Sequence, residues 1–587
     1  MTNNENTPAT PQSGTKKERI LARLRALLPH LPTIAFAWAF LFAIGVCAYF
    51  ILYPAEGFFH SDCTDTILWA EASYDAGAVF NPDFKYAALL PFGASIWLVP
   101  LIAIFGVTMK THVIGMLIFL LLFAASIVLV CRKMRWSYAY SFGCGALMLL
   151  ILSSSEKLLE IMWNHVIYYS LGLLLYFVIL ALAFWAMDHL EAPKKGRIRA
   201  LLPLIPLTAF CLLTALNGFQ MLVLTVAPVC AGFFAERFFD RSQSLFSKKN
   251  LPTALVLACS AVGMLFGTAL LDALLGDISA SYANAYSTFS AIDNWAANAD
   301  KFFINWLTLL GVSVKTSDSL ISGDSIVNIL RIGTGILLTV VPLLLLCFYH
   351  KIENRYTRIL VIAHAFLLAF LLFGSICGKL GAANWRLTPL LGSSVITTVA
   401  AVKLAVEHRK TAVVSCRTGV VILIVIALLG TQNARWITAM PKDYGRDNDL
   451  HLLAQKLEEE GLTYGYATFW RSQAITLLSD SKVKTREILV EKDGIETDMY
   501  QSQGAWYEDQ EGVSEYFVLL SHSELTTVQR SDFWKNLQKH CAVRVIQYEG
   551  YYIFVFAENI WHDHTGEPIV EQPEDEEDDG GHTPDVD

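Results

Sequence analysis

Residues 16–53 read KKERILARLRALLPHLPTIAFAWAFLFAIGVCAYFILY, a basic stretch that runs directly into an apolar one. A helix needs about 20 apolar residues to cross a bilayer, and residues 34–53 are long enough. Lysine and arginine favour the cytoplasmic side of a membrane helix. We therefore expect residues 1–33 to be a cytoplasmic, basic amphipathic N-terminus that lies on anionic headgroups. The first span then leaves the cytoplasm.

The rest of the chain continues the apolar pattern. Of its 587 residues, 54% are hydrophobic and 17% are charged, whereas a soluble domain carries about 25% charged residues. The predicted spans are residues 34–53, 112–131, 137–153, 166–187, 200–217, 219–235, 251–271, 328–348, 359–377, 387–405 and 418–433. The sequence thus predicts an α-helical polytopic membrane protein with about 11 transmembrane helices.

Basic residues support this number of spans, because they occur in every second loop. The basic residues of these loops are Lys16, Lys17, Arg19, Arg23, Arg25, Arg132, Lys133, Arg135, Lys194, Lys195, Arg197, Arg199, Arg237, Arg241, Lys248, Lys249, Lys351, Arg355, Arg358, Arg409, Lys410 and Arg417. Residues 87–107 (AALLPFGASIWLVPLIAIFGV) are also apolar, but an extra span there would break the alternation. Two prolines and a glycine interrupt them. We interpret them as a segment on the outer surface, with a true span as the alternative.

The predicted transmembrane domain, residues 34–435, includes two large outer loops, 54–111 and 272–327. From about residue 436 the chain turns polar. Strands at 464–470, 516–520 and 543–556, the last a hairpin around Glu549-Gly550, alternate with helices at 449–460, 471–479 and 531–540. Residues 436–562 are therefore predicted to form a small extracytoplasmic α/β domain. Residues 563–587 are acidic and are expected to be disordered, which argues against a nucleic acid as partner.

The first outer loop carries the densest cluster of chemically active side chains. Its residues 58–93 read FFHSDCTDTILWAEASYDAGAVFNPDFKYAALLPFG. A span, an acidic residue (Asp62), a short helix (64–76), Gly77, Pro82, Lys85 and a surface segment ending at Phe105-Gly106 follow one another. This layout resembles the integral-membrane glycosyltransferases of the C superfamily, which include the protein O-mannosyltransferases and the lipid A aminoarabinose transferase.

The resemblance implies an enzyme that takes a sugar from a polyprenyl phosphate and passes it to a hydroxyl. Asp62 is then the candidate catalytic base, with Asp65 as the second candidate. Many relatives carry Asp-Glu where this chain has Asp62-Cys63, so a metal-binding role for Asp62 needs a substitute for that Glu, for which Asp65, Glu71 and His60 are the candidates. A divalent cation is one way to neutralise the leaving phosphate. A solvated loop aspartate or a helix N-cap is the plain structural alternative for Asp62.

The leaving phosphate needs cationic partners on the outer side. The candidates are Lys85, Lys379 and Arg386, and a guanidinium suits a phosphate best. Trp385 is a candidate for stacking on a sugar, or else part of the aromatic belt at the membrane surface. His165, in the second outer loop, either binds the acceptor or packs against its neighbours.

These features predict a cell-membrane, multi-pass glycosyltransferase whose partners are a polyprenyl-phosphate sugar, the bilayer and a glycan, lipid or protein acceptor in the cell envelope. The alternatives are a secondary transporter and a non-catalytic protein of envelope assembly. A transporter usually places ionisable residues near the midplane of its spans, and the predicted spans contain few of them.

Overall fold

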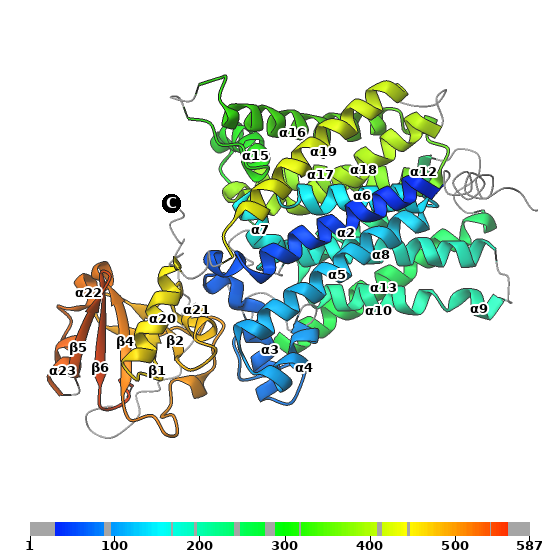
Figure 1. Cartoon of the computed structure of the whole chain (residues 1–587). Coiled ribbons are helices and arrows are strands. Elements are labelled where there is room, and N and C mark those ends of the chain that lie inside the picture. Colours follow the sequence, from blue (N-terminus) through cyan, green and yellow to red (C-terminus); the bar gives the residue numbers. More distant parts are fainter. Residues whose placement is uncertain are drawn as a thin grey trace, which may run out of the picture.

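The computed structural model describes residues 30–86, 95–165, 168–192, 197–239, 247–275, 288–315, 319–407, 414–442, 447–540 and 542–561. The basic N-terminal stretch, residues 87–94 of the surface segment and the acidic tail lie outside these ranges. Figure 1 shows a bundle of long helices with a small sheet domain at one end. The predicted fold class is confirmed.

The long helices coincide with the predicted spans. They are α2 (Leu31–Leu52), α5 (Met109–Lys133), α6 (Tyr138–Ile151), α8 (Tyr168–Glu191), α10 (Leu204–Ala215), α12 (Val226–Phe239), α13 (Leu251–Leu275), α16 (Gly323–Cys347), α17 (Arg355–Ile376), α18 (Thr388–Glu407) and α19 (Cys416–Ala439). Short helices α9 (Arg197–Leu201) and α11 (Phe219–Leu224) extend α10 and α12. In the described residues, ten helices are long and apolar enough to cross a membrane, or eleven if α6 and α7 (Glu156–Trp163) form one broken span.

The break between α6 and α7 is a bend of 118°. Three consecutive serines cause it, because their hydroxyls compete with the helical backbone for hydrogen bonds. Ser153 and Ser154 donate to carbonyls of the turn before them, and Ser155 caps the N-terminus of α7. Trp163 of α7 then packs between Phe119 and Phe123 of α5.

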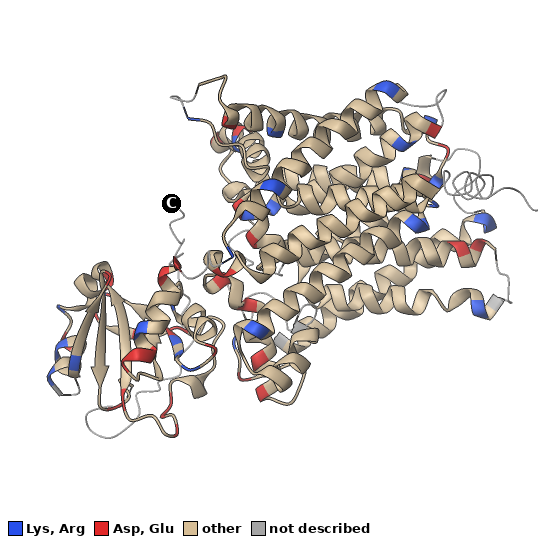
Figure 2. Ribbon diagram, in the orientation of Figure 1, with Lys and Arg blue, Asp and Glu red and all other residues tan. Residues whose placement is uncertain are grey.

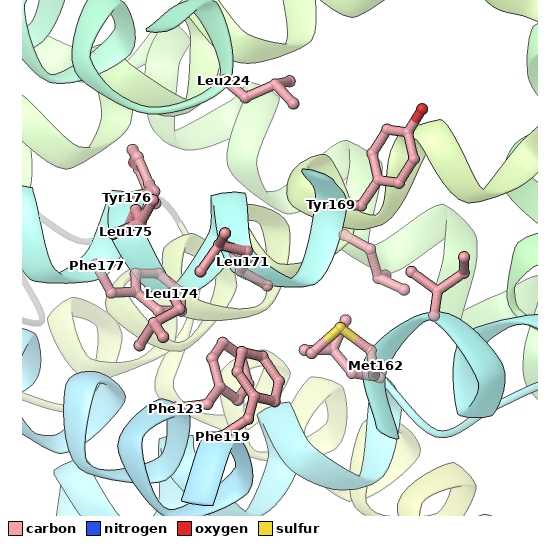
Figure 3. Packing of buried hydrophobic residues seen from close by; sticks show 14 of the residues in the cluster. Phe119, Phe123, Met162, Tyr169, Leu171, Leu174, Leu175, Tyr176, Phe177 and Leu224 are labelled. Carbon is pink, nitrogen blue, oxygen red and sulfur yellow. The ribbon is translucent and has the colours of Figure 1, made fainter. Parts of the chain in front are cut away.

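The helices pack around an aromatic core next to this bend. Figure 3 shows Phe119 and Phe123 of α5 facing Met162 of α7 and Leu174 of α8, and all four are buried. Close packing of large side chains holds these three helices in one arrangement. The end of α7 and the start of α8, which flank His165, are thereby fixed against α5.

The two ends of the bundle differ in charge and in what they hold. At one end Arg135 pairs with Asp188 at 3.3 Å, and Arg355 pairs with Glu236 at 3.0 Å and with Glu191. These contacts gather the basic loops after α5, α8 and α12 and before α17. Figure 2 shows Lys and Arg at the helix ends far from the sheet domain. The opposite end, which we call the domain end, carries the sheet domain (Figure 1).

The segment that connects α2 to α5, residues 53–108, lies at the domain end and is called the first loop here. It contains α3 (Asp65–Asp75) and α4 (Ser95–Phe105). The described part of the apolar surface segment forms only this 11-residue α4, too short to cross a bilayer. Residues 87–94 lie outside the described residues, so the interpretation of the whole segment as a surface segment stays a prediction.

The sheet domain is a mixed sheet of six strands in the order β3-β2-β1-β4-β6-β5. The strands are β1 (Tyr464–Ala467), β2 (Lys484–Val490), β3 (Ile495–Thr497), β4 (Tyr516–Ser521), β5 (Ala542–Tyr548) and β6 (Tyr551–Phe556). The helices are α20 (Asp449–Glu459), α21 (Ser472–Leu478), α22 (His522–Val528) and α23 (Asp532–His540). The predicted hairpin is present: Glu549 and Gly550 both have positive φ, as a type I′ turn requires. Strands β2 and β3 and helix α22 are additions to the prediction.

The sheet domain packs tightly on the first loop. One buried apolar cluster contains Phe59 and Ile67 of the first loop together with Leu457 and Ile475 of the domain. The amide of Asn448 donates to the carbonyls of Glu56 and Phe59, at 3.1 Å each. The sheet domain is therefore fixed against the first loop, because an apolar core shared by two parts of a chain resists their separation.

Candidate active site

The candidate catalytic segment begins nine residues after the last residue of α2. A 3-10 turn over Ser61–Thr64 leads into α3, whose first residue is Asp65. Asp62 is half-buried in that turn, and Asp65 is 8% exposed. A carboxylate in the first turn of a helix is favoured by the helix dipole. Two acidic side chains thus lie one turn apart, Asp62 half-buried and Asp65 buried.

Asp65 is held from two sides. Its Oδ1 accepts a hydrogen bond of 2.9 Å from Nε2 of Gln501, a residue of the sheet domain. Its Oδ2 lies 3.6 Å from Nε2 of His165. Burial raises the pKa of the Asp65 carboxyl, His165 and Gln501 act against that rise, and the carboxylate of Asp62 adds to it. A buried carboxylate with a raised pKa is a stronger base than an ordinary one.

A second network joins the first loop to α7 and to the segment before α18. Nε2 of His60 lies 3.2 Å from Oε1 of Glu160, and Nζ of Lys157 lies 2.8 Å from Oε2 of Glu160. The same ammonium sits 4.7 Å from the ring centroid of Trp385. The ring of Trp470 in the sheet domain approaches His60 from the other side, with centroids 6.1 Å apart. Polar groups from four parts of the chain therefore meet around His60 and Lys157.

Arg386 lies in the 3-10 turn Asn384–Leu387 before α18. Its side chain is 7% exposed, and Nη1 donates to the carbonyl of Lys379 at 3.2 Å. Helix α15 (Trp295–Leu309) braces this segment, since Asn305 donates to the carbonyl of Gly381 and Asn384 donates to Thr308. The guanidinium is therefore fixed in place next to Trp385, whereas the side chain of Lys379 is exposed.

Glu71, the other carboxylate suggested for a metal ion, lies beside an arginine of the sheet domain. Its Oε1 lies 3.6 Å from Nη2 of Arg486 in the sheet domain, and that guanidinium stacks on Trp506 at 3.6 Å. Across the described ranges, no group of three or more His, Cys, Asp or Glu residues is placed to hold a metal ion. The Glu71 carboxylate thus has a guanidinium as its neighbour, and the metal role suggested for Asp62 and Glu71 stays a prediction.

The predicted site residues fall into three groups. Asp65 and His165 lie side by side, and Asp62 is one turn away. Trp385 is connected to the first loop through Lys157, Glu160 and His60, and Arg386 is the next residue in the chain. Lys85 lies elsewhere on the first loop, where its side chain is exposed and its backbone N–H donates to the carbonyl of Ser502 at 2.8 Å.

Three contributors were missed by the sequence reasoning: Lys157 and Glu160 as ion partners, and Gln501. The Lys-x-x-Glu spacing of the first two is typical of an ion pair along a helix. Gln501 carries no comparable signal, because it comes from a loop of another domain.

Comparisons with known proteins address the fold. No family model and no curated protein matches the sequence. The structure is similar to that of ArnT from Cupriavidus metallidurans bound to undecaprenyl phosphate, with a TM-score of 0.51 and 10% identity over 90% of this chain and 98% of that chain. The oligosaccharyltransferase AglB from Archaeoglobus fulgidus, in complex with an inhibitory peptide and a dolichol-phosphate, gives a TM-score of 0.45 at 10% identity, over 91% of this chain and 75% of that chain. The similarity to ArnT shows that this chain shares the fold of that protein along almost its whole length, as the resemblance implies.

Proposed function

We propose that the chain is a membrane glycosyltransferase that moves a sugar from a polyprenyl phosphate to an acceptor hydroxyl at the domain end. The observation that carries this proposal is the convergence, at one end of the bundle, of Asp62, the Asp65–His165 pair and the Trp385-Arg386 segment. A base, a polar group for orientation and a fixed cation are what such a displacement needs. The fold shared with ArnT supports the same assignment, since that protein binds undecaprenyl phosphate.

In the proposed reaction, Asp62 accepts the proton of the acceptor hydroxyl as its oxygen attacks the anomeric carbon. Asp62 is suited to this role because it is half-buried and accessible to a substrate. Asp65 holds the imidazole of His165, which then orients the acceptor or the sugar. The bond between the anomeric carbon and the phosphate oxygen breaks on the opposite face, so the anomeric centre inverts.

The polyprenyl phosphate that leaves carries negative charge and stays at the membrane surface. Arg386 is the proposed partner of this phosphate, since a guanidinium binds two of its oxygens in one plane. Lys157 and Lys379 supply further positive charge on the same side of the bundle. Trp385 offers an aromatic face for the sugar, with Lys157 on its ring.

We further propose that the domain end faces the outside of the cell membrane and that the basic end faces the cytoplasm. The gathering of Arg135, Arg237 and Arg355 at the end opposite the sheet domain supports this orientation, because basic loops stay on the cytoplasmic side. The acceptor is then a glycan, lipid or protein of the cell envelope.

The test uses the purified full-length protein in lipid nanodiscs. It is incubated with undecaprenyl phosphate that carries radiolabelled mannose or aminoarabinose, with an envelope extract as acceptor. The proposal predicts transfer of label to the extract and release of free undecaprenyl phosphate. Uptake of labelled sugar into sealed vesicles without release of the lipid phosphate would instead identify a transporter.

A further inference from the structure

Three consecutive residues of the sheet domain, Gln501 to Gln503, join it to the first loop. Gln501 donates to Oδ1 of Asp65 at 2.9 Å. The carbonyl of Ser502 accepts from the backbone N–H of Lys85 at 2.8 Å, and the side chain of Gln503 accepts a hydrogen bond from the same loop at 3.2 Å. Of these contacts, the one from Gln501 reaches a candidate catalytic carboxylate.

The conformation of Gln501 separates it from an ordinary docking contact. Its backbone has φ of +51°, a left-handed conformation that non-glycine residues adopt at an energetic cost. Its side chain is 1% exposed, and its Oε1 has no hydrogen-bond partner within the described part of the chain. Strained residues of this kind persist where the surrounding structure holds them for a purpose.

The loop around Gln501 is rigid. Ser502 donates to the hydroxyl of Tyr507 at 3.1 Å, and that hydroxyl lies 2.7 Å from the carbonyls of both Glu487 and Asp498. These bonds tie the loop to strand β2 and to the chain that follows β3. The amide of Gln501 is therefore aimed at Asp65 by the fold of the sheet domain, which limits how far the carboxylate can rotate.

We propose that Gln501 is a positioning residue of the active site: its amide fixes the Asp65 carboxylate so that Oδ2 faces His165. This inference rests on the proposed function, and it makes the sheet domain a part of the catalytic site. The amide is suited to the task because it donates a hydrogen bond without a charge of its own. It therefore favours the ionised form of Asp65 at every working pH.

Three titratable groups face Asp65 from the elements around it. Asp62 comes from the preceding turn, His165 from the chain before α8 and Glu487 from strand β2. The carboxylate of Asp62 disfavours a charge on Asp65, whereas His165 favours one. Burial raises the pKa of Glu487 well above its usual range, and Asp65 adds to that rise. Burial and Asp62 raise the pKa of the Asp65 carboxyl and Gln501 lowers it. Loss of the Gln501 donor therefore lets Asp65 take up its proton at a higher pH.

The experiment compares the wild type with Gln501→Leu and Gln503→Leu in lipid nanodiscs. Transfer from undecaprenyl phosphate that carries labelled sugar is measured between pH 4 and pH 9, chosen as about two units either side of an ordinary histidine. Melting temperature is measured over the same range. Gln503→Leu is the matched control, because it removes a bond of the same loop to a group other than Asp65.

Gln501→Leu should move the acidic limb of the rate profile up by about one pH unit and lower kcat about tenfold at neutral pH, with little change in KM. Its melting temperature should fall further below the wild type as pH rises, because ionisation of Asp65 then opposes folding over a wider range. In Gln503→Leu, the acidic limb of the pH–rate profile should lie at the same pH as in the wild type.

An active wild type whose acidic limb is the same in Gln501→Leu would overturn the positioning role and leave the proposed function intact. A wild type without transfer would contradict the proposed function. In that case the melting temperatures test whether Gln501 acts on Asp65. If the melting temperature of Gln501→Leu depends on pH as that of the wild type does, the inference is overturned as well.

Discussion

Nε2 of His60 lies 3.2 Å from Oε1 of Glu160, and this ion pair joins the candidate catalytic segment to helix α7. Lys157 shares the same carboxylate at 2.8 Å. Glu160→Gln leaves both cations without their counter-charge and should lower the free energy of unfolding by about 1–3 kcal/mol. The lower part of this range is expected because His60 and Lys157 are partly exposed. Melting in detergent measures the change, with Glu156→Gln, exposed on the same helix, as control. Equal melting temperatures would contradict the role of this pair.

The rate of transfer should decline at acid pH because of Asp65. Burial raises the pKa of its carboxyl, so the ionised form is lost at a pH above the ordinary value of about 3.9. His165→Leu removes a neighbour that favours the ionised form, and the acidic limb should therefore move to higher pH. A rate profile of the two proteins checks the direction. A limb that stays in place, or that moves to lower pH, would speak against the pairing of Asp65 with His165.

Arg486 should be essential for docking of the sheet domain. It is buried beside Glu71, with Nη2 and Oε1 3.6 Å apart. Arg486→Met leaves a buried carboxylate without its partner, which destabilises by about 3 kcal/mol or more. We expect faster release of the sheet domain by protease and a lower melting temperature. Lys484→Met, exposed on the same strand, should behave as the wild type, and an Arg486→Met protein that resists protease equally would refute the prediction.

Arg386 should determine affinity for the lipid phosphate. Loss of a charge-assisted hydrogen bond is worth about 1.5–3 kcal/mol, so Arg386→Ala should weaken binding of undecaprenyl phosphate about 10–100-fold. Arg386→Lys should recover part of this loss, because an ammonium keeps the charge without the planar fork. Titration of the purified proteins with undecaprenyl phosphate measures the effect. Lys301→Ala, on the exposed face of α15, is the control, and equal affinity of all variants would exclude Arg386 from the site.

The spans were predictable because lipid forces a helix to be both long and apolar, and because basic loops alternate with other loops. The break in the helix after Ile151 was not predictable from the sequence. The predicted span continues to Ser153, and the bend depends on which carbonyls accept hydrogen bonds from the serine hydroxyls. Strand β2 was missed because Thr485, Arg486 and Glu487 are polar yet buried. These residues are buried because they contact the first loop and β1. Contacts with such distant segments cannot be predicted from the local sequence pattern.

The same distinction holds for the candidate site. Asp62 and Asp65 were found from the sequence because they follow a span and precede a short helix. The contact between Asp65 and Gln501 joins two parts of the protein that are far apart in the chain. The periodicity and the charge pattern of the sequence therefore could not predict it. The contact between Glu71 and Arg486 has no trace in the local sequence either, because Arg486 lies in the sheet domain.

The most direct test of the account is sugar transfer by Asp62→Asn. The variant, the wild type and Asp83→Asn, an exposed aspartate of the same loop, are loaded with equal amounts of undecaprenyl phosphate that carries labelled sugar. The account predicts that Asp62→Asn retains the bound lipid and loses about 100-fold or more in rate, while Asp83→Asn transfers normally. Transfer by Asp62→Asn at the rate of the wild type would contradict the central claim.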